Sequence, residues 1–65
     1  MDGEELRHRR EDELHMSQGQ LAARLMVRRQ TIGEWETGAR RIRLPAVLSL
    51  ALDALAWERE RPAED

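Results

Sequence analysis

Arginines are concentrated in one segment of this 65-residue chain, where their guanidinium groups could bind an anionic partner. Residues 24–43 contain six arginines and two acidic residues, a net charge of +4. Residues 1–23 and 44–65 each carry a net charge of −3, so the overall charge of −2 hides the basic segment. A basic patch on an acidic body is typical of nucleic-acid binders, although a solvated surface without a partner can have the same composition.

Other kinds of chemistry find little support in the sequence. The chain has no cysteine, and its two histidines, His8 and His15, lack a third metal ligand. No nucleophile and base are paired with a supporting third group, so we expect no enzyme, no metal site and no cofactor. No apolar run approaches the ~20 residues of a membrane span, and the N-terminus is acidic where a signal peptide is basic. We therefore expect a complete, cytoplasmic protein without a membrane partner.

Helices must position the arginines, because β-branched residues are few and the glycines are scattered. The first predicted helix begins after Asp2, a good N-cap, and runs to about Leu14. Leu6 and Leu14 can share a face, but Arg10 lies between them, which predicts a covering helix that contributes little to the core. We expect an all-α fold, a small bundle of four to five helices.

Two further helices are predicted around the basic segment. Ser17 and Gln20 have the spacing of a capping box, and this helix should end near Met26. The next helix should begin near residue 28 or 29, because Ile32 and Trp35 then share a buried face. Its opposite face is long and polar, and Gly38 is a plausible C-cap.

The run SQGQLAARLMVRRQTIGEWETG, residues 17–38, closely resembles the helix-turn-helix of the Cro/CI-type (XRE-like) repressor family. Arg10 ahead of the run and the helix led by Pro45 after it extend the resemblance over most of the chain. The resemblance implies a lambda-repressor-like fold, in which the helix near residues 28–37 lies in the major groove of duplex DNA. It also suggests an ion pair between Arg10 and Glu36.

The resemblance assigns DNA contacts residue by residue. Arginine can pair with guanine, glutamine with adenine, and glutamate can accept a hydrogen bond from cytosine. The implied base-reading residues are Gln18, Arg28, Arg29, Gln30 and Glu34. The implied phosphate contacts are Ser17, Thr31, Arg40, Arg41 and Arg43.

The sequence departs from the family pattern at four places. Met26 stands where the family usually has glycine, and Arg28 replaces the small hydroxyl residue that caps the recognition helix. The stretch between Arg10 and Gln18 is one residue longer than usual. Gly33, in the middle of a helix, either permits close approach of the backbone to DNA or is a tolerated defect of roughly 1 kcal/mol.

The last predicted helix, about residues 45–60, carries two apolar stripes. A surface helix needs only one such stripe, so the second predicts a contact with another subunit; a compact monomer that wraps the helix more deeply is the alternative. The stripe assigned to the core is Leu44, Leu48, Ala51, Leu52 and Leu55. The stripe assigned to a homodimer interface is Val47, Leu50, Ala54 and Trp57.

These observations predict a helix-turn-helix DNA-binding domain over residues 1–61, with a C-terminal dimerisation helix, followed by an acidic tail at 62–65. The predicted function is a sequence-specific transcriptional regulator, a dimeric autorepressor that binds an inverted-repeat operator through the major groove. Proteins of this sort are encoded by phages and plasmids. One alternative is an antitoxin that also binds a toxin protein. A toxin-wrapping segment is usually an additional tail, and only eight residues follow Trp57. The other alternative is a scaffolding helix bundle.

Overall fold

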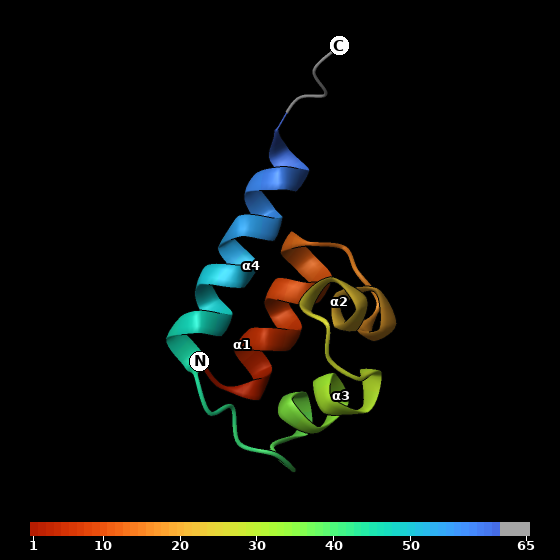
Figure 1. The fold of residues 1–65 in the computed structure, drawn as a ribbon, viewed down its shortest axis with the longest axis vertical. Coiled ribbons are helices and arrows are strands. Elements are labelled where there is room, and N and C mark those ends of the chain that lie inside the picture. Colours follow the sequence, from red (N-terminus) through yellow and green to blue (C-terminus); the bar gives the residue numbers. More distant parts are fainter. Residues whose placement is uncertain (62–65) are drawn as a thin grey trace.

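The computed structural model describes residues 1–61, and these form an all-α bundle, as predicted. Helix α1 passes through the middle, α4 runs along one side of it, and α2 and α3 lie on the other (Figure 1). None of the described helices is both long and apolar enough to cross a bilayer. In chain order the elements are α1 (Gly3–His8), the π-helix η1 (Arg9–Glu13), α2 (Gln18–Leu25), α3 (Arg29–Thr37) and α4 (Pro45–Glu60).

The predicted helix starts are confirmed by their caps. The carboxylate of Asp2 accepts a 2.8 Å hydrogen bond from the backbone N–H of Glu5 at the start of α1. Ser17 and Gln20 form both bonds of a capping box at the start of α2. Pro45 occupies the first turn of α4, where its missing N–H leaves no helical bond unmade.

The helix that contains α1 and η1 belongs to the core, so the prediction of a mere cover is wrong. Leu6, Arg10 and Leu14 are all buried. The N–H of Leu14 donates to the carbonyl of Arg9 at 2.9 Å, five residues back, and this π-turn holds more residues per turn than an α-helix. Because each residue of the π-turn rotates by a smaller angle about the helix axis, Leu14 returns to the face of Leu6 and Arg10. The π-turn thus absorbs the additional residue between Arg10 and Gln18.

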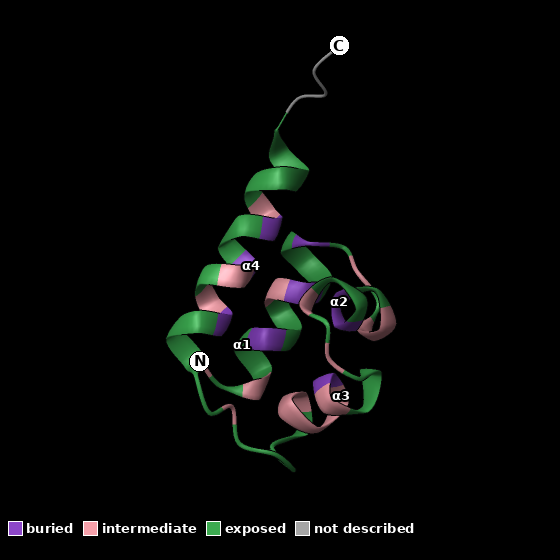
Figure 2. Ribbon diagram, viewed as in Figure 1, coloured by how far each residue is buried: buried purple, intermediate pink, exposed green. Residues whose placement is uncertain are grey.

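The core is formed by apolar side chains from all four α-helices. The face of α4 that meets the other helices is buried, whereas its outer face is exposed (Figure 2). Leu44, predicted as core, is 65% exposed because it is the N-cap residue and its backbone lies outside the helical conformation. The buried apolar residues are Leu6, Leu14, Leu21, Ala22, Ile32, Leu48, Leu52 and Leu55.

The stripe predicted to be surplus to the core is exposed along its whole length. Val47, Leu50, Ala54 and Trp57 all lie on the outside of α4, with Leu50 68% exposed. The last turns of α4 project beyond the other helices (Figure 1). A monomer that wraps α4 more deeply, the alternative reading of the two stripes, is therefore wrong.

Candidate nucleic-acid interface

Helices α2 and α3 are joined by a tight turn at Met26 and Val27. Met26 has φ 59° and ψ 40°, the left-handed conformation that a glycine would adopt without strain. Its side chain is 92% exposed and displaces no neighbour, so the cost of the substitution is the conformational strain of the backbone, roughly 1–2 kcal/mol. The N–H of Val27 donates to the carbonyl of Ala22 at 3.0 Å and closes the turn. The predicted helix-turn-helix is present with its family geometry despite the missing glycine.

The two helices pack through a small set of buried residues. Leu21 and Ala22 of α2 and Ile32 of α3 are buried, and the methyl group of Ala22 leaves room for a close crossing. Trp35 is half-buried and packs against the same core, as its shared face with Ile32 predicts. The opposite face of α3 is therefore presented to solvent.

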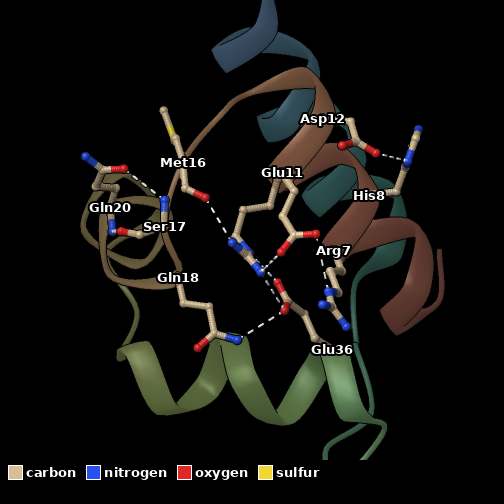
Figure 3. A network of polar contacts seen from close by, with 10 residues as sticks. Arg7, His8, Glu11, Asp12, Met16, Ser17, Gln18, Gln20 and Glu36 are labelled. Carbon is tan, nitrogen blue, oxygen red and sulfur yellow. Dashed lines mark hydrogen bonds and ion pairs between the residues drawn. The ribbon is translucent and has the colours of Figure 1, made fainter.

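A buried ion pair anchors α3 to the N-terminal helix. Nε of Arg10 lies 2.6 Å from Oε2 of Glu36, and the two side chains are only 8% and 5% exposed. Arg10 also donates to Oε1 of Glu36 at 3.1 Å and to the carbonyl of Met16 at 2.9 Å. Figure 3 shows Met16, Gln18 and Glu36 converging on this network. The ion pair suggested by the family resemblance is thus confirmed.

The protonation of this pair follows from its hydrogen bonds. Burial alone would raise the pKa of Glu36, but hydrogen bonds from Arg10 and Gln18 and the charges of Arg10 and Arg7 outweigh it, so the pKa is lowered. The hydrogen bonds to Glu36 raise the pKa of Arg10 against the opposing effect of its burial. Both groups are therefore charged at neutral pH.

Gln18, a predicted base reader, is turned toward this network. Its Nε2 donates to Oε1 of Glu36 at 3.1 Å, and the residue is half-buried (Figure 3). A Cβ built on Gly33 would lie 3.8 Å from both polar atoms of the Gln18 carboxamide, an ordinary contact. Gln18 therefore lies between the two helices of the motif, with its amide group already engaged.

Three predicted base readers form the exposed start of α3. Arg28 is the N-cap residue and Arg29 and Gln30 are the first helical residues, and all three are exposed. The Arg28 side chain makes no capping hydrogen bond, because a guanidinium group has no acceptor to offer the free N–H groups. Replacement of the usual hydroxyl residue thus exchanges a cap for an additional positive charge at the helix start.

Glu34, the remaining predicted base reader, links α3 to the connector that follows it. Its Oε1 accepts from Nε of Arg40 at 3.0 Å, and its Oε2 accepts from Nε2 of Gln30 at 3.5 Å. The backbone N–H of Arg40 also donates to the carbonyl of Glu34 at 3.1 Å. Glu34 thus holds a predicted base reader and a predicted phosphate contact in one cluster.

The remaining predicted phosphate contacts lie at both ends of the motif. The Ser17 hydroxyl oxygen accepts the 3.0 Å bond of the capping box, which leaves its O–H able to donate. Thr31 is half-buried beside the connector, and Arg41 and Arg43 are exposed on it. The structure brings Arg40, Arg41 and Arg43 together after α3 and leaves Ser17 at the start of α2.

Carboxylates neutralise the arginines of the N-terminal helix but spare most of the basic segment. Arg7, Arg9, Arg10 and Arg24 each lie within 4 Å of a carboxylate oxygen. Among residues 1–61, four arginines of the basic segment form no ion pair, which leaves their charge available to a partner: Arg28, Arg29, Arg41 and Arg43.

Two contacts that hold the helices behind this surface together were not predicted from the sequence. Arg9 contacts Asp53 of α4 at 2.5 Å and the Ser49 hydroxyl at 3.4 Å, and thereby fixes α4 against the N-terminal helix. Gly3 lies against α3, since a Cβ there would be 2.4 Å from the carbonyl oxygen of Glu36. The spacing of Arg9 from Glu13 indicates only a local helix pair, and no sequence signal marks the contact of Gly3.

Comparison with known proteins agrees with this geometry. A family model described as helix-turn-helix matches residues 6–52, which include the buried Arg10, both helices of the motif and the basic connector. Searches of curated proteins and of solved structures gave no match. The chain belongs to the Cro/CI-type (XRE-like) helix-turn-helix family of DNA-binding regulators.

Proposed function

We propose that this protein is a sequence-specific transcriptional repressor that binds an inverted-repeat operator as a homodimer. The observation that carries the proposal is the separation of charge, because four arginines that form no ion pair within residues 1–61 flank the exposed face of α3, whereas the arginines of the N-terminal helix are paired. Such a surface suits the phosphate backbone of duplex DNA. Since a DNA-binding regulator acts where the DNA is, we infer a cytoplasmic location.

Base reading is assigned to the start of α3. In the docking geometry of this fold, the N-terminal residues of the recognition helix enter the major groove. Arg28, Arg29 and Gln30 are the exposed side chains at that position, so we assign them the direct base contacts. Gln18 and Glu34 are within the same interface, and each must exchange an internal hydrogen bond for one to a base.

Phosphate contacts are assigned to the two ends of the motif. The connector arginines 40, 41 and 43 reach one strand, and the start of α2, with its free N–H groups and the Ser17 hydroxyl, suits the other. Thr31 is the assigned hydroxyl donor on α3. These contacts set affinity and register but carry no sequence information.

A homodimer supplies the specificity that one small domain lacks. A single recognition helix reads only a few base pairs, whereas two helices related by a twofold axis read half-sites about 10 base pairs apart. The exposed stripe of α4 offers a self-complementary apolar surface for that axis. It comprises Val47, Leu50, Ala54 and Trp57.

Selection from random duplex oligonucleotides tests the proposal directly. We expect enrichment of an inverted repeat, and we expect binding that weakens steeply with salt, with a slope of about −0.9 in log affinity against log salt for each phosphate contact. A flat salt dependence, or no enriched sequence, would contradict DNA reading. An enriched site without symmetry would contradict the dimer. A stable complex with a toxin that requires the stripe of α4 would favour the antitoxin alternative.

A further inference from the structure

An apolar groove lies between the helix-turn-helix and the first half of α4. Its volume is about 350 Å³, which falls within the range of roughly 300–1,000 Å³ that small-molecule sites occupy. Its walls combine side chains from the turn, from α3, from the connector and from α4. The apolar lining residues are Leu25, Val27, Trp35, Ile42, Leu44, Val47, Leu48 and Ala51.

The remaining residues that line this groove are polar, and three of the four are cationic. Arg40, Arg41 and Arg43 lie along it together with the hydroxyl residue Thr31. Of the residues that the structure describes, no acidic one lines the groove. Within residues 1–61, Arg41 and Arg43 form no ion pair. An apolar trough whose lining includes two arginines without ion pairs is complementary to a molecule that has an apolar chain and a single anionic end.

We propose that this groove binds an amphipathic carboxylate, such as a medium-chain fatty acid. The alkyl chain lies along the apolar walls beside Trp35, and the carboxylate accepts charge-assisted hydrogen bonds from Arg41 and Arg43. A second copy of the chain suits the site less well. Of the acidic residues of its α4, Asp53 and Glu58 are already bound by Arg9 and Arg24, and only Glu60, the last residue of that helix, forms no ion pair among the described residues.

Occupation of the groove has a consequence for DNA, which rests on the function proposed above. The carboxylate of the ligand neutralises the same connector arginines that are assigned to contact DNA phosphates. Its alkyl chain lies against Thr31 and Trp35 of the recognition helix. A ligand that competes for these groups weakens DNA binding, and DNA weakens ligand binding by the same factor. The amphiphile is thereby an inducer that releases the operator.

Calorimetric titration of the full chain in the absence of DNA tests the site separately from the function. The probes are sodium decanoate, decanol and decyltrimethylammonium, all below the concentrations at which they form micelles. We expect saturable binding of one decanoate per chain, and binding about tenfold weaker for the uncharged alcohol, because it loses the pairing with two guanidinium groups. Equal affinity for the three probes, or no saturation with decanoate, overturns the proposal.

Variants locate the ligand within the groove. Ala51→Phe fills the space between α4 and the turn, and Arg41→Gln combined with Arg43→Gln removes the charge while it keeps the apolar walls. Each is expected to reduce decanoate affinity about tenfold or more. Arg59→Gln is the control for a change of charge away from the groove, since it removes one positive charge from the far end of α4. Unchanged decanoate binding in the double arginine variant overturns the proposal even if Ala51→Phe fails to fold.

Two further measurements separate the competing explanations. If decanoate affinity falls as protein concentration rises, a second copy occupies the groove, and the proposal is overturned. If decanoate binds as expected but leaves the affinity for the selected operator unchanged, the inducer role is overturned. Decanoate binding without any specific DNA binding by the protein would contradict the proposed function and leave the ligand site supported.

Discussion

Glu36 illustrates how one buried charge supports the DNA-facing helix from behind. Its carboxylate accepts hydrogen bonds from Arg10 and Gln18, so the α3 helix that carries it is held to both α2 and the N-terminal helix. Loss of one member of a buried ion pair leaves the other charge uncompensated, which typically costs 3–5 kcal/mol. Such a loss is a large share of the stability of so small a domain.

Glu36→Gln is expected to lower the free energy of unfolding by about 3 kcal/mol at neutral pH, since Arg10 loses its counter-charge. The pKa of Glu36 is lowered in the folded state, so its contribution is present above the unfolded pKa of about 4 and disappears as pH falls through the folded value. The difference between the variant and the parent should therefore shrink below pH ~4. Urea unfolding at several pH values measures it.

Glu5→Gln is the control for this prediction, because Glu5 is exposed and its side chain forms no ion pair within residues 1–61. It should change stability by no more than about 0.5 kcal/mol. A loss for Glu36→Gln that stays constant down to pH 2 would contradict the charge-based explanation.

Two glycines are expected to respond in opposite ways to the same change. Gly33→Ala should raise stability by about 0.5–1 kcal/mol, because its new methyl group meets only ordinary contacts 3.8 Å away and removes backbone freedom from the unfolded chain. Gly3→Ala should lower stability by about 1–3 kcal/mol, because the methyl would lie 2.4 Å from the carbonyl oxygen of Glu36. Thermal unfolding measures both, and a shift of the same sign would refute the packing argument.

Gln30 and Arg41 are expected to affect DNA binding differently. Gln30→Ala should cost about 1–3 kcal/mol on the selected operator and relax one base position, since it removes a proposed base contact. Arg41→Ala should weaken operator and random duplex equally and reduce the salt slope by about 1, because phosphate contacts carry no sequence information. Fluorescence anisotropy with both duplexes measures these effects. Equal losses on both duplexes for Gln30→Ala would contradict its role as a base reader.

At the scale of elements, the π-turn decides which residues of the N-terminal helix face the core. The five-residue hydrogen bond from Leu14 to Arg9 accommodates one residue more than the family usually has in this stretch. A continuous α-helix would rotate Leu14 by about 80° from Leu6. The insertion is therefore tolerated only because it is confined to a single wide turn.

Deletion of Asp12, an exposed residue of η1, is expected to convert the π-turn into an α-turn. Leu6, Arg10 and Leu14 then still share one face, so stability should change by no more than about 1 kcal/mol. Deletion of Ala23, equally exposed but in the middle of α2, should unfold the protein because it rotates Leu25 and the turn away from α3. Circular dichroism and urea unfolding distinguish the two. An equal loss of stability from both deletions would contradict the explanation that the π-turn accommodates the additional residue locally.

At the scale of the whole molecule, the two apolar stripes of α4 differ in their surroundings. Of the inner stripe, Leu48, Leu52 and Leu55 are buried against the other helices, whereas the outer stripe is exposed and unnecessary to the core. Ion pairs of Arg9 with Asp53 and of Arg24 with Glu58 hold α4 in that orientation. An exposed apolar patch of this kind is typical of an interaction site.

Leu50→Glu is expected to leave the helical content intact and to produce monomers that lose tight operator binding, because a charge then faces the proposed twofold axis. Leu52→Glu is the matched control and should unfold the domain, since Leu52 is fully buried. Sedimentation velocity and circular dichroism separate the two results. A parent protein that remains monomeric at tens of micromolar and still binds one full inverted repeat would contradict the dimer.

The sequence alone determined the helices, their caps and the family. Capping pairs, helical periodicity and the turn residues act over a few positions along the chain, so the helix-turn-helix and the Ser17 capping box could be predicted. The charge pattern likewise located the basic segment before any fold was known. The ion pair of Arg10 with Glu36 could be expected only through the family resemblance.

The tertiary structure decided which residues are buried and which charges remain free. Arg10 has a polar side chain, and only a partner 26 residues away in the sequence makes its burial favourable. Leu44 and Leu48 share a predicted stripe, yet the backbone leaves the helix at Leu44 and exposes it. Free arginines on the connector, the apolar groove beside them and the contact of Gly3 with α3 all depend on contacts between distant segments. Burial and ion pairing arise from three-dimensional packing, and local sequence patterns do not encode them.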